Sequence, residues 1–203
     1  MKDRVKCYKI YAAWEYEKEE KELDEASKKG LQLIKGGCFH SEFKRDNSVR
    51  YIYQLDYNTG IKDFARYKEI FEEQGWEYIN STFNGWHYFR KPYKENMEEC
   101  EMKIYTDTES LSEMQNRWLS IMQILAGIYA VMTIVYLING ATQSLRSLFI
   151  EGIMFGLLSI TMGLGARSIK RKRAGKESGF TLPLQWILLI AIILLVGIIP
   201  FML

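Results

Sequence analysis

The residues of this chain that could do chemistry are few and far apart. The 203-residue sequence has two histidines, His40 and His87, and three cysteines. Cys38 and His40 are two positions apart, so an extended strand would place the thiol and the imidazole on one face. They would supply two of the three or four ligands that a bound metal needs. The sequence therefore predicts no metal site and no cofactor.

Catalytic groups are also poorly supported. Nucleophilic catalysis needs a base and an orienting carboxylate beside a serine or a cysteine. Asp56 and His87 are available, but no motif links them to a nucleophile. Gly36-Gly37 alone does not make a phosphate-binding loop and indicates a bulge or bend. We therefore expect a protein that is not an enzyme.

Aromatic side chains are the one group whose clustering in the sequence suggests a binding surface. Seven of them crowd three expected strands and form a candidate surface for a ligand or a partner. One interpretation is a core with cross-strand aromatic pairs, and the other is a groove for a small apolar molecule or a peptide. The seven residues are Tyr51, Tyr53, Tyr57, Trp76, Tyr78, Trp86 and Tyr88.

The elements that must position these residues alternate between strands and helices. Period-2 and period-3.6 patterns predict the order β-α-β-β-α-β-β, an α+β domain that is ferredoxin-like with one added strand. A helix over 14–29 would present its Glu and Lys runs as a solvated face. Expected strands cover 5–11, 31–43 (interrupted at Gly36-Gly37), 49–57, 76–82 and 86–91, with a second helix over 62–74 and an Asn-Gly turn at 83–85.

Three long apolar segments follow the α+β domain. They cover about 118–138, 148–165 and 184–203. About 20 helical residues cross a hydrocarbon core of about 30 Å, so the sequence predicts an all-α region of three transmembrane helices. The expected organisation is a domain over 1–105, a helical linker over 106–117 and a membrane domain over 118–203. A capping box at Thr106 or Ser110 would start a helix that runs into the first span.

The loop charges predict an orientation. Six basic residues lie within ten positions between the second and third spans, whereas 139–147 carries only Arg146. The positive-inside rule places the basic segment and the N-terminal domain in the cytoplasm and the C-terminus outside the cell membrane. The segment sets topology, or it also binds anionic lipid. Its residues are Arg167, Lys170, Arg171, Lys172, Arg173 and Lys176.

Small residues in the second span predict helix packing. Gly152 and Gly156 fit the pattern that lets two helix backbones approach closely, and Gly163 follows on the same span. Packing within the chain is the simplest expectation, and a homo-oligomer is the alternative.

Charge and cysteine use narrow the class of partner. The chain up to Arg117 has 20 basic and 23 acidic residues, so the domain has a net charge of −3 and would repel nucleic acid. The remaining 7 basic and 2 acidic residues give +5. Cys7, Cys38 and Cys100 are odd in number and widely spaced, which favours reduced, mostly buried thiols in a reducing compartment. The first residues lack the apolar core of a cleaved secretory signal.

Five ordered segments resemble the family named domain of unknown function 2812, over residues of about 3–115. The resemblance implies a soluble domain combined with C-terminal membrane spans, in a bacterial family without an established activity or ligand. Family members are often encoded beside PadR-type transcription regulators. The family helix often carries Trp-Leu where this chain has Glu22-Leu23. The segments are Trp14–Glu20, Lys28–Leu33, Tyr51–Tyr57, Gly75–Tyr78 and Gly85–Arg90.

These observations favour a membrane-anchored, non-enzymatic sensor or adaptor. Its cytoplasmic domain would bind a protein partner, such as a transcription regulator, in response to a membrane signal. The alternative is a component that binds or exports a small molecule or lipid, with its site on the aromatic sheet face or in the helix bundle.

Overall fold

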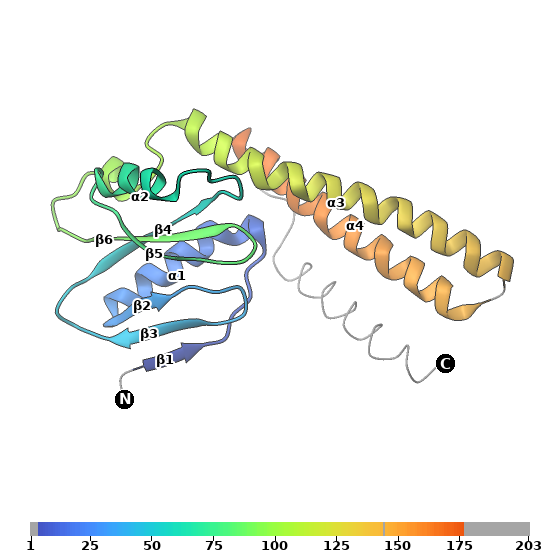
Figure 1. Cartoon of the computed structure of the whole chain (residues 1–203), viewed down its shortest axis with the longest axis horizontal. Coiled ribbons are helices and arrows are strands. Elements are labelled where there is room, and N and C mark those ends of the chain that lie inside the picture. The colour runs from blue at the N-terminus through green and yellow to red at the C-terminus, as the bar shows by residue number, and fades with distance from the viewer. Residues whose placement is uncertain (1–3, 144, 177–203) are drawn as a thin grey trace. The chain divides into compact units, whose positions relative to one another are not determined.

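Six strands and two helices build the first part of the chain in the computed structural model, which describes residues 4–143 and 145–176 (Figure 1). The chain divides after Trp118 into two units. The first unit contains β1 (Arg4–Cys7), α1 (Tyr16–Lys28), β2 (Leu31–Lys35), β3 (Ser41–Arg45), β4 (Tyr51–Tyr57), α2 (Phe64–Glu72), β5 (Glu77–Ser81), β6 (Trp86–Pro92) and the short 3-10 helices η1 (Ala13–Glu15) and η2 (Glu99–Met102). This part of the chain is α+β, as predicted.

The strands form two antiparallel three-stranded sheets, in the orders β1-β3-β2 and β4-β6-β5. The prediction of a single strand over 31–43 is wrong, since the chain reverses there and Leu33 pairs with Phe43. A Cβ atom on Gly36 would lie 2.5 Å from the Tyr88 ring, and one on Gly37 would lie 2.5 Å from the His40 carbonyl oxygen. The two glycines therefore permit a tight reversal that side chains would block. The ferredoxin-like arrangement is not confirmed.

Side chains join the two sheets. Asn80 on β5 accepts a hydrogen bond from the Gly36 N–H at 2.8 Å and donates one to the Gly36 carbonyl at 2.9 Å. The Leu33 N–H donates to the Tyr53 hydroxyl at 2.9 Å. Because Leu33 is on β2 and Tyr53 is on β4, these contacts connect strands of different sheets.

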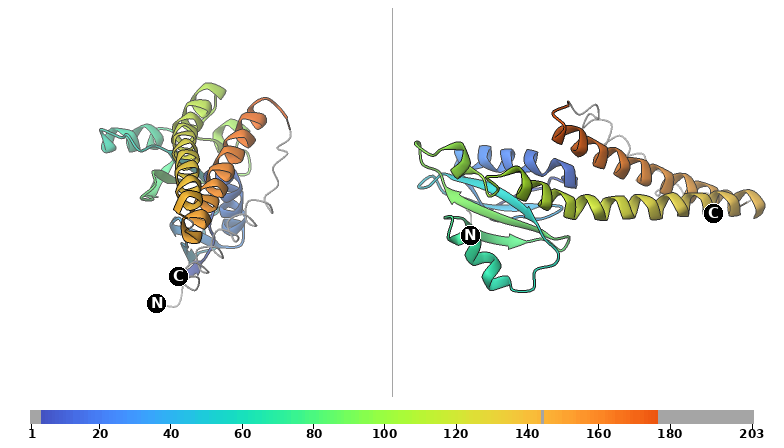
Figure 2. Two further views of the ribbon diagram at one scale, coloured as in Figure 1. Left: turned by 90° about the vertical axis from the view of Figure 1, so that its right-hand side faces the viewer. Right: turned by 90° about the horizontal axis from the view of Figure 1, so that it is seen from above.

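The two helices cover opposite sides of the sheet β4-β6-β5 (Figure 2). Helix α2 begins after Asp63, whose carboxylate accepts a hydrogen bond from the Arg66 N–H at 3.0 Å. Its buried residue Phe71 packs in an apolar cluster with residues of β4, β6 and the segments beside them. The buried members of this cluster are Ile52, Phe71, Trp76, Phe89 and Ile104.

Helix α3 (Thr108–Gln143) starts in the first unit and continues into the second. Its cap is Asp107, whose carboxylate accepts from the Ser110 N–H at 2.7 Å. The predicted capping boxes at Thr106 and Ser110 are therefore wrong, although the helix does run on without a break. The cap is one residue after Thr106, which we predicted for this position.

The second unit contains the rest of α3 and α4 (Arg146–Arg173), both long and apolar enough to cross a membrane. The predicted third span, 184–203, lies outside the described residues. Helix α4 extends to Arg173, so most of the basic segment that we expected as a loop is helical. A Cβ atom on Gly152 would lie 2.9 Å from Leu137 of α3, and one on Gly156 would lie 3.4 Å from Thr133. Gly163 has no described atom within 4 Å of its Cβ position.

The cysteines and His40 differ from their predicted settings. Cys7 and Cys38 are half-buried and Cys100 is exposed, so the expectation of mostly buried thiols is wrong. Cys7 lies on an edge strand, where the sheet covers one side only. Cys38 and His40 lie in the turn before β3 rather than on a strand, so they share no strand face. The described residues contain no group of three potential metal ligands.

Candidate functional site

Helix α1 buries acidic side chains on the face that meets the sheets. Its buried positions repeat at helical spacing, three or four residues apart, and they are Tyr16, Glu19, Glu20, Leu23 and Ser27. Glu15, just before α1, is buried as well. The prediction of a solvated charged face is therefore wrong for these glutamates. The periodic positions around Leu23 could have indicated that Glu19 and Glu20 face the core.

Three side chains of this helix satisfy the open edge of β4. Glu20 accepts from the Leu55 N–H at 2.8 Å, Asp24 from the Tyr53 N–H at 2.8 Å, and Ser27 from the Tyr51 N–H at 2.7 Å. The three acceptors lie on one face of α1, because they are four and three residues apart. They meet every second N–H of β4, which are the ones that point toward its open edge. The arrangement substitutes for a neighbouring strand, since an unpaired backbone N–H in the interior is costly.

Burial changes the acidity of these carboxyl groups. It raises the pKa of Glu20 well above its ordinary value, against the Leu55 hydrogen bond, and the nearby carboxylates add to the rise. Burial also raises the pKa of Asp24 to about 6 and that of Glu19 to about 7. Glu19 accepts a hydrogen bond from the Tyr88 hydroxyl at 2.8 Å, which acts in the opposite direction. The α1 face therefore holds carboxyl groups that titrate near neutral pH.

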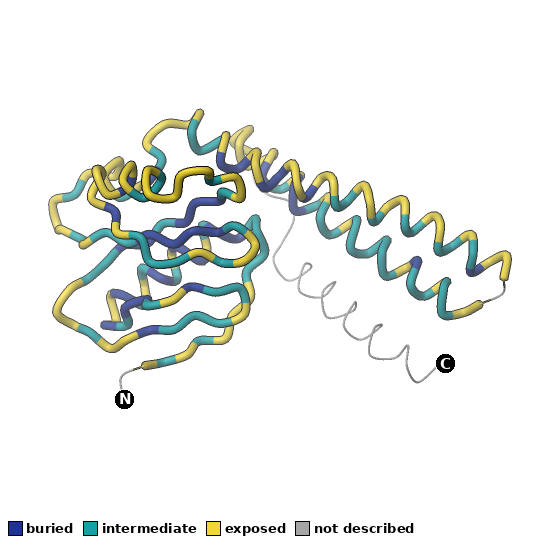
Figure 3. Tube along the Cα trace, in the orientation of Figure 1, coloured by how far each residue is buried: buried dark blue, intermediate teal, exposed yellow. Residues whose placement is uncertain are grey.

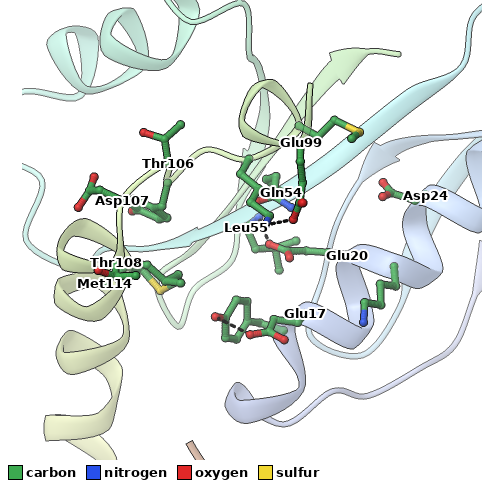
Figure 4. A pocket seen from close by; sticks show the side chains of 16 residues that line it. Glu17, Glu20, Asp24, Gln54, Leu55, Glu99, Thr106, Asp107, Thr108 and Met114 are labelled. Atoms are coloured by element: carbon green, nitrogen blue, oxygen red, sulfur yellow. Dashed lines mark hydrogen bonds and ion pairs between the residues drawn. The ribbon is translucent and has the colours of Figure 1, made fainter. Parts of the chain in front are cut away.

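A cavity of about 510 Å³ lies beside this acidic face (Figure 4). One wall is α1, with Glu17, Glu20, Lys21 and Asp24, and β4 contributes Gln54 and Leu55. The other wall comes from η2 and from the first turns of α3, residues 108–117, which we name the α3 root. Its lining side chains include Met102, Lys103, Tyr105, Thr108, Leu111 and Met114. Every lining residue belongs to the first unit.

A second polar cluster, the Asp56 cluster, lies on the other face of β4. Asp56 is buried and accepts hydrogen bonds from the hydroxyls of Tyr67, at 2.6 Å, and Tyr105. Arg117 of the α3 root lies 3.5 Å from the same carboxylate. Burial and the neighbouring Asp56 charge raise the pKa of both tyrosines, so the hydroxyls keep their protons and act as donors. The cluster holds α2, the segment after η2 and the α3 root together.

The cavity and the Asp56 cluster share a residue. The ring of Tyr105 lines the cavity while its hydroxyl binds Asp56. Gln115 of the α3 root donates to the Tyr16 hydroxyl at 2.7 Å, and Tyr16 lines the cavity too. A change at the cavity wall can therefore reach the α3 root directly, through the Tyr16–Gln115 hydrogen bond, and indirectly, from Tyr105 through Asp56 to Arg117.

Asp56 and His87 are opposite one another in the pairing of β4 and β6. They do not form a catalytic pair, because the Asp56 oxygens are taken by the tyrosines and Arg117. His87 Nε2 lies 2.9 Å from the Asn58 carbonyl oxygen, and its Nδ1 is buried without a hydrogen-bond partner among the described residues. The pair contributes to packing around Tyr67, whose ring centroid is 5.1 Å from that of His87.

The aromatic residues of the predicted surface lie mostly in the interior. β4 and β6, which carry five of the seven, are mostly buried (Figure 3). Tyr53, Tyr57, Trp76, Trp86 and Tyr88 are buried, whereas Tyr51 and Tyr78 are half-buried. They are divided between the two faces of the sheet. Trp86 stacks on Tyr16, the first residue of α1, and Trp76 and Tyr78 pack with the α2 cluster. This placement favours the interpretation as a core with cross-strand pairs.

Fold and site together define a class of protein: an α+β domain with an acidic, partly apolar cavity, whose last helix continues as a long apolar helix. The chain belongs to the family described as "Protein of unknown function (DUF2812)", whose family model matches residues 15–126. The family resemblance is therefore confirmed, and the match covers the cavity and the start of the apolar part of α3. Neither the curated proteins nor the solved structures gave a match to this chain.

Proposed function

We propose that this protein is a membrane-anchored sensor that binds a small molecule in the cavity of its first unit. The observation that carries the proposal is the composition of the cavity wall. Thr108, Leu111 and Met114 line the cavity, and they belong to the helix that continues as a long apolar segment to Gln143. A ligand in the cavity would therefore contact the same helix that enters the membrane.

The lining is suited to binding. It combines hydrogen-bonding carboxyl groups with the apolar side chains of Leu55, Met102 and Leu111. Ligand pockets in proteins have this combination, and they typically have volumes of about 300–1,000 Å³. We propose a binding role and not an enzymatic one.

Ligand binding would act on the α3 root through its hydrogen bonds. Tyr105 and Arg117 meet at Asp56, and Gln115 meets Tyr16. A ligand shifts a conformational equilibrium only by its differential affinity for the two arrangements. Displacing Tyr16 or Tyr105 would break a contact of the root, so ligand-bound and ligand-free arrangements of α3 would differ in energy.

We further propose that α3 and α4 cross the cell membrane. The basic segment at the end of α4 favours a cytoplasmic location for this end and for the N-terminal unit. Anionic lipid would be its partner at the membrane surface. A third span over 184–203 would place the C-terminus outside.

The test is to purify the tagged full-length protein in a mild detergent and to identify the small molecules it retains by native mass spectrometry. Wild type is compared with the double variant Met102→Trp/Leu111→Trp, which fills the cavity from two half-buried positions. Glu113→Trp is the control, because Glu113 is exposed on α3 and does not line the cavity. We expect a ligand on wild type and on the control only. Identical retained molecules on all three proteins would contradict the proposal.

A specific observation also favours the adaptor role with a protein partner, such as a transcription regulator. Three exposed aromatic residues, Tyr8, Phe39 and Phe83, lie on three loops of the first unit. The loops are linked by the ring contact between Tyr8 and His40 and by a hydrogen bond from the Cys38 thiol to Asn84 at 3.3 Å. Exposed aromatic residues that gather in this way are common at protein interfaces.

This second role predicts that Tyr8→Ser/Phe39→Ser/Phe83→Ser would remove a near-stoichiometric protein that co-purifies with the full-length chain. The ligand-retention pattern of the cavity should not change in this variant. If the partner stays bound to the triple variant and is lost from the cavity-filled variant, the loops are not the partner surface.

A further inference from the structure

We propose that the cavity binds a cationic amphiphile, an organic amine or ammonium ion joined to an apolar body. This inference rests on the proposed function, because it names the ligand class of the same cavity. It follows from the unequal chemistry of the two cavity walls. The α1 wall is acidic, with Glu17, Glu20 and Asp24, whereas the wall made by η2 and the α3 root supplies the apolar side chains of Met102, Leu111 and Met114 beside polar and charged groups (Figure 4).

Glu20 is the residue that most strongly points to a cationic group. Its side chain is 9 % exposed and lines the cavity. One carboxyl oxygen accepts from the Leu55 N–H at 2.8 Å. Among the residues that the structure describes, no donor binds the second oxygen and no cation pairs with the group. This second oxygen is not among the fully enclosed unpartnered atoms, so it is open to the cavity, where an ammonium N–H could donate to it.

The other acids of the α1 wall add to the negative potential. Glu17 and Asp24 are three residues before and four residues after Glu20, so all three carboxyl groups lie along one side of the helix. Lys21 is the only basic residue that α1 contributes to the described lining, and it can offset one of the three. Carboxyl groups therefore outnumber the lysine on this wall, and the charges of Glu17 and Asp24 would favour a ligand cation beside the protonated Glu20.

The remaining charged groups of the lining are already engaged. Lys103 forms an ion pair with Glu99 at 2.5 Å, so these two charges offset each other. Asp107 accepts the Ser110 N–H and caps α3, where the positive end of the helix dipole meets it. Neither pair supplies a cation to Glu20. The cationic end of a ligand would thus lie against α1.

The apolar body of the ligand would lie on the opposite wall. Met102, Leu111 and Met114 line it, and Leu55 of β4 adjoins them. Methionine side chains adapt to ligands of different shape, because they are unbranched and polarisable. A cavity of about 510 Å³ has room for a headgroup and an apolar body together.

Binding of a cation at Glu20 should release a proton. Burial raises the pKa of Glu20, and an adjacent ammonium ion would lower it again. The charged groups that face Glu20 are three carboxyl groups and a lysine on α1, and the engaged groups opposite. On α1 they are Glu17, Glu19, Asp24 and Lys21; opposite are Glu99 and Lys103 on η2 and beside it, and Asp107 before α3. A neutral ligand would release no proton from this group.

The test measures binding of four probes to the full-length protein in a non-ionic detergent by isothermal titration calorimetry. The probes are n-octylammonium, 1-octanol and octanoate, which share one chain and differ in charge, and spermidine, which is a cation without an apolar body. We expect n-octylammonium to bind about tenfold or more tightly than each of the others, as a charge-assisted contact predicts. Titration in buffers of different ionisation enthalpy should show proton release for n-octylammonium only.

Three variants assign the effect to Glu20. Glu20→Gln keeps an acceptor for the Leu55 N–H, so the fold is retained, and it should weaken n-octylammonium about tenfold and abolish proton release. Asp24→Asn, which keeps an acceptor for Tyr53, should weaken n-octylammonium by a smaller factor. Glu25→Gln is the matched control on the exposed side of α1, where Glu25 pairs with Lys28, and it should leave the affinity unchanged.

The outcomes separate this inference from the proposed function. If octanol or octanoate binds wild type as tightly as n-octylammonium, and binding is lost in Met102→Trp/Leu111→Trp, the ligand class is wrong and the cavity remains a ligand site. Equal binding of spermidine overturns the apolar part of the inference. If n-octylammonium binds wild type, Glu20→Gln and the cavity-filled variant with the same affinity, the inference of a cationic amphiphile in this cavity is wrong. The retention experiment on small molecules decides the proposed function independently.

Discussion

The two sides of β4 are buried by different chemistry. On the α2 side, Phe71 and Phe89 pack with ring centroids 4.4 Å apart, and the buried carboxylate of Asp56 accepts hydrogen bonds at both oxygens. On the α1 side, Glu19 and Glu20 are buried and Asp24 is half-buried, and the cavity lies beside Glu20 and Asp24. The α2 side has the character of a structural core, whereas the α1 side keeps polar groups and open volume.

This difference indicates where the protein gives up stability for function. Buried carboxyl groups whose pKa values are raised by desolvation destabilise the folded state at neutral pH. Perturbed acids beside a cavity are typical of functional sites. We therefore expect substitutions on the α2 side to change stability, and those on the α1 side to change ligand binding and the pH dependence of stability.

The largest effect is expected for Phe89→Ala. Phe89 has 0 % exposure in the apolar cluster, and truncating a buried phenylalanine typically costs about 3–5 kcal/mol of unfolding free energy. Thermal unfolding of the full-length protein, followed by tryptophan fluorescence, measures the loss. Phe83→Ala is the control, since Phe83 is 86 % exposed. Equal stability of the two variants would contradict the assignment of the α2 side as the core.

Asp56→Asn should cost about 2–3 kcal/mol, because the hydrogen bonds to Tyr67 and Tyr105 lose their charged acceptor and Arg117 loses its counter-ion. The same unfolding measurement applies. Glu72→Gln, at an exposed position of α2, is the matched control. A loss no larger than in the control would mean that the Asp56 cluster does not hold the α3 root.

The pH dependence of stability should separate Glu19→Gln from wild type. The pKa of Glu19 is raised to about 7 in the folded state, so its protonated form stabilises the fold relative to the unfolded chain. This stabilisation is complete at a pH below the unfolded-state pKa near 4.5, and it is lost as the pH rises through 7. The free energy of unfolding of Glu19→Gln, measured relative to wild type, should therefore be higher at pH 8 than at pH 5, by on the order of 2 kcal/mol.

Glu25→Gln provides the control for this pH series, because Lys28 lowers the pKa of the exposed Glu25. Its stability relative to wild type should not rise with pH. A parallel pH profile for Glu19→Gln and wild type would show that burial does not perturb Glu19, and the contrast between the two sides of β4 would lose its electrostatic part.

The smallest effect is expected for Ser27→Ala, at about 1–2 kcal/mol. Ser27 accepts from the Tyr51 N–H and donates to Gln32 at 2.7 Å, so the variant leaves the end of the β4 edge unpaired. Hydrogen exchange of the Tyr51 amide should accelerate more than that of Ile52, which is paired to β6. Ser81→Ala, at an exposed position on β5, controls for the loss of a hydroxyl.

Much of the fold could be predicted from local signals. The 3.6-residue pattern located α1 and α2, the Asn-Gly turn located the hairpin of β5 and β6, and uncharged apolar length located α3 and α4. The reversal between β2 and β3 was missed because a glycine pair is equally consistent with a bulge. Pairing into two sheets was also missed, since strand order depends on contacts between distant segments.

The sequence by itself determined the α+β character of the first unit and the two long apolar helices, because both follow from composition and short-range periodicity, and its ordered motifs carried the resemblance to the family. Only the tertiary structure decided that Glu20 and Asp24 meet backbone donors 35 and 29 residues away. Helical periodicity identifies the face on which a side chain lies, but it does not tell what covers that face. The acids of α1 lie between a strand edge and a cavity because α1 packs against β4 and β2 together.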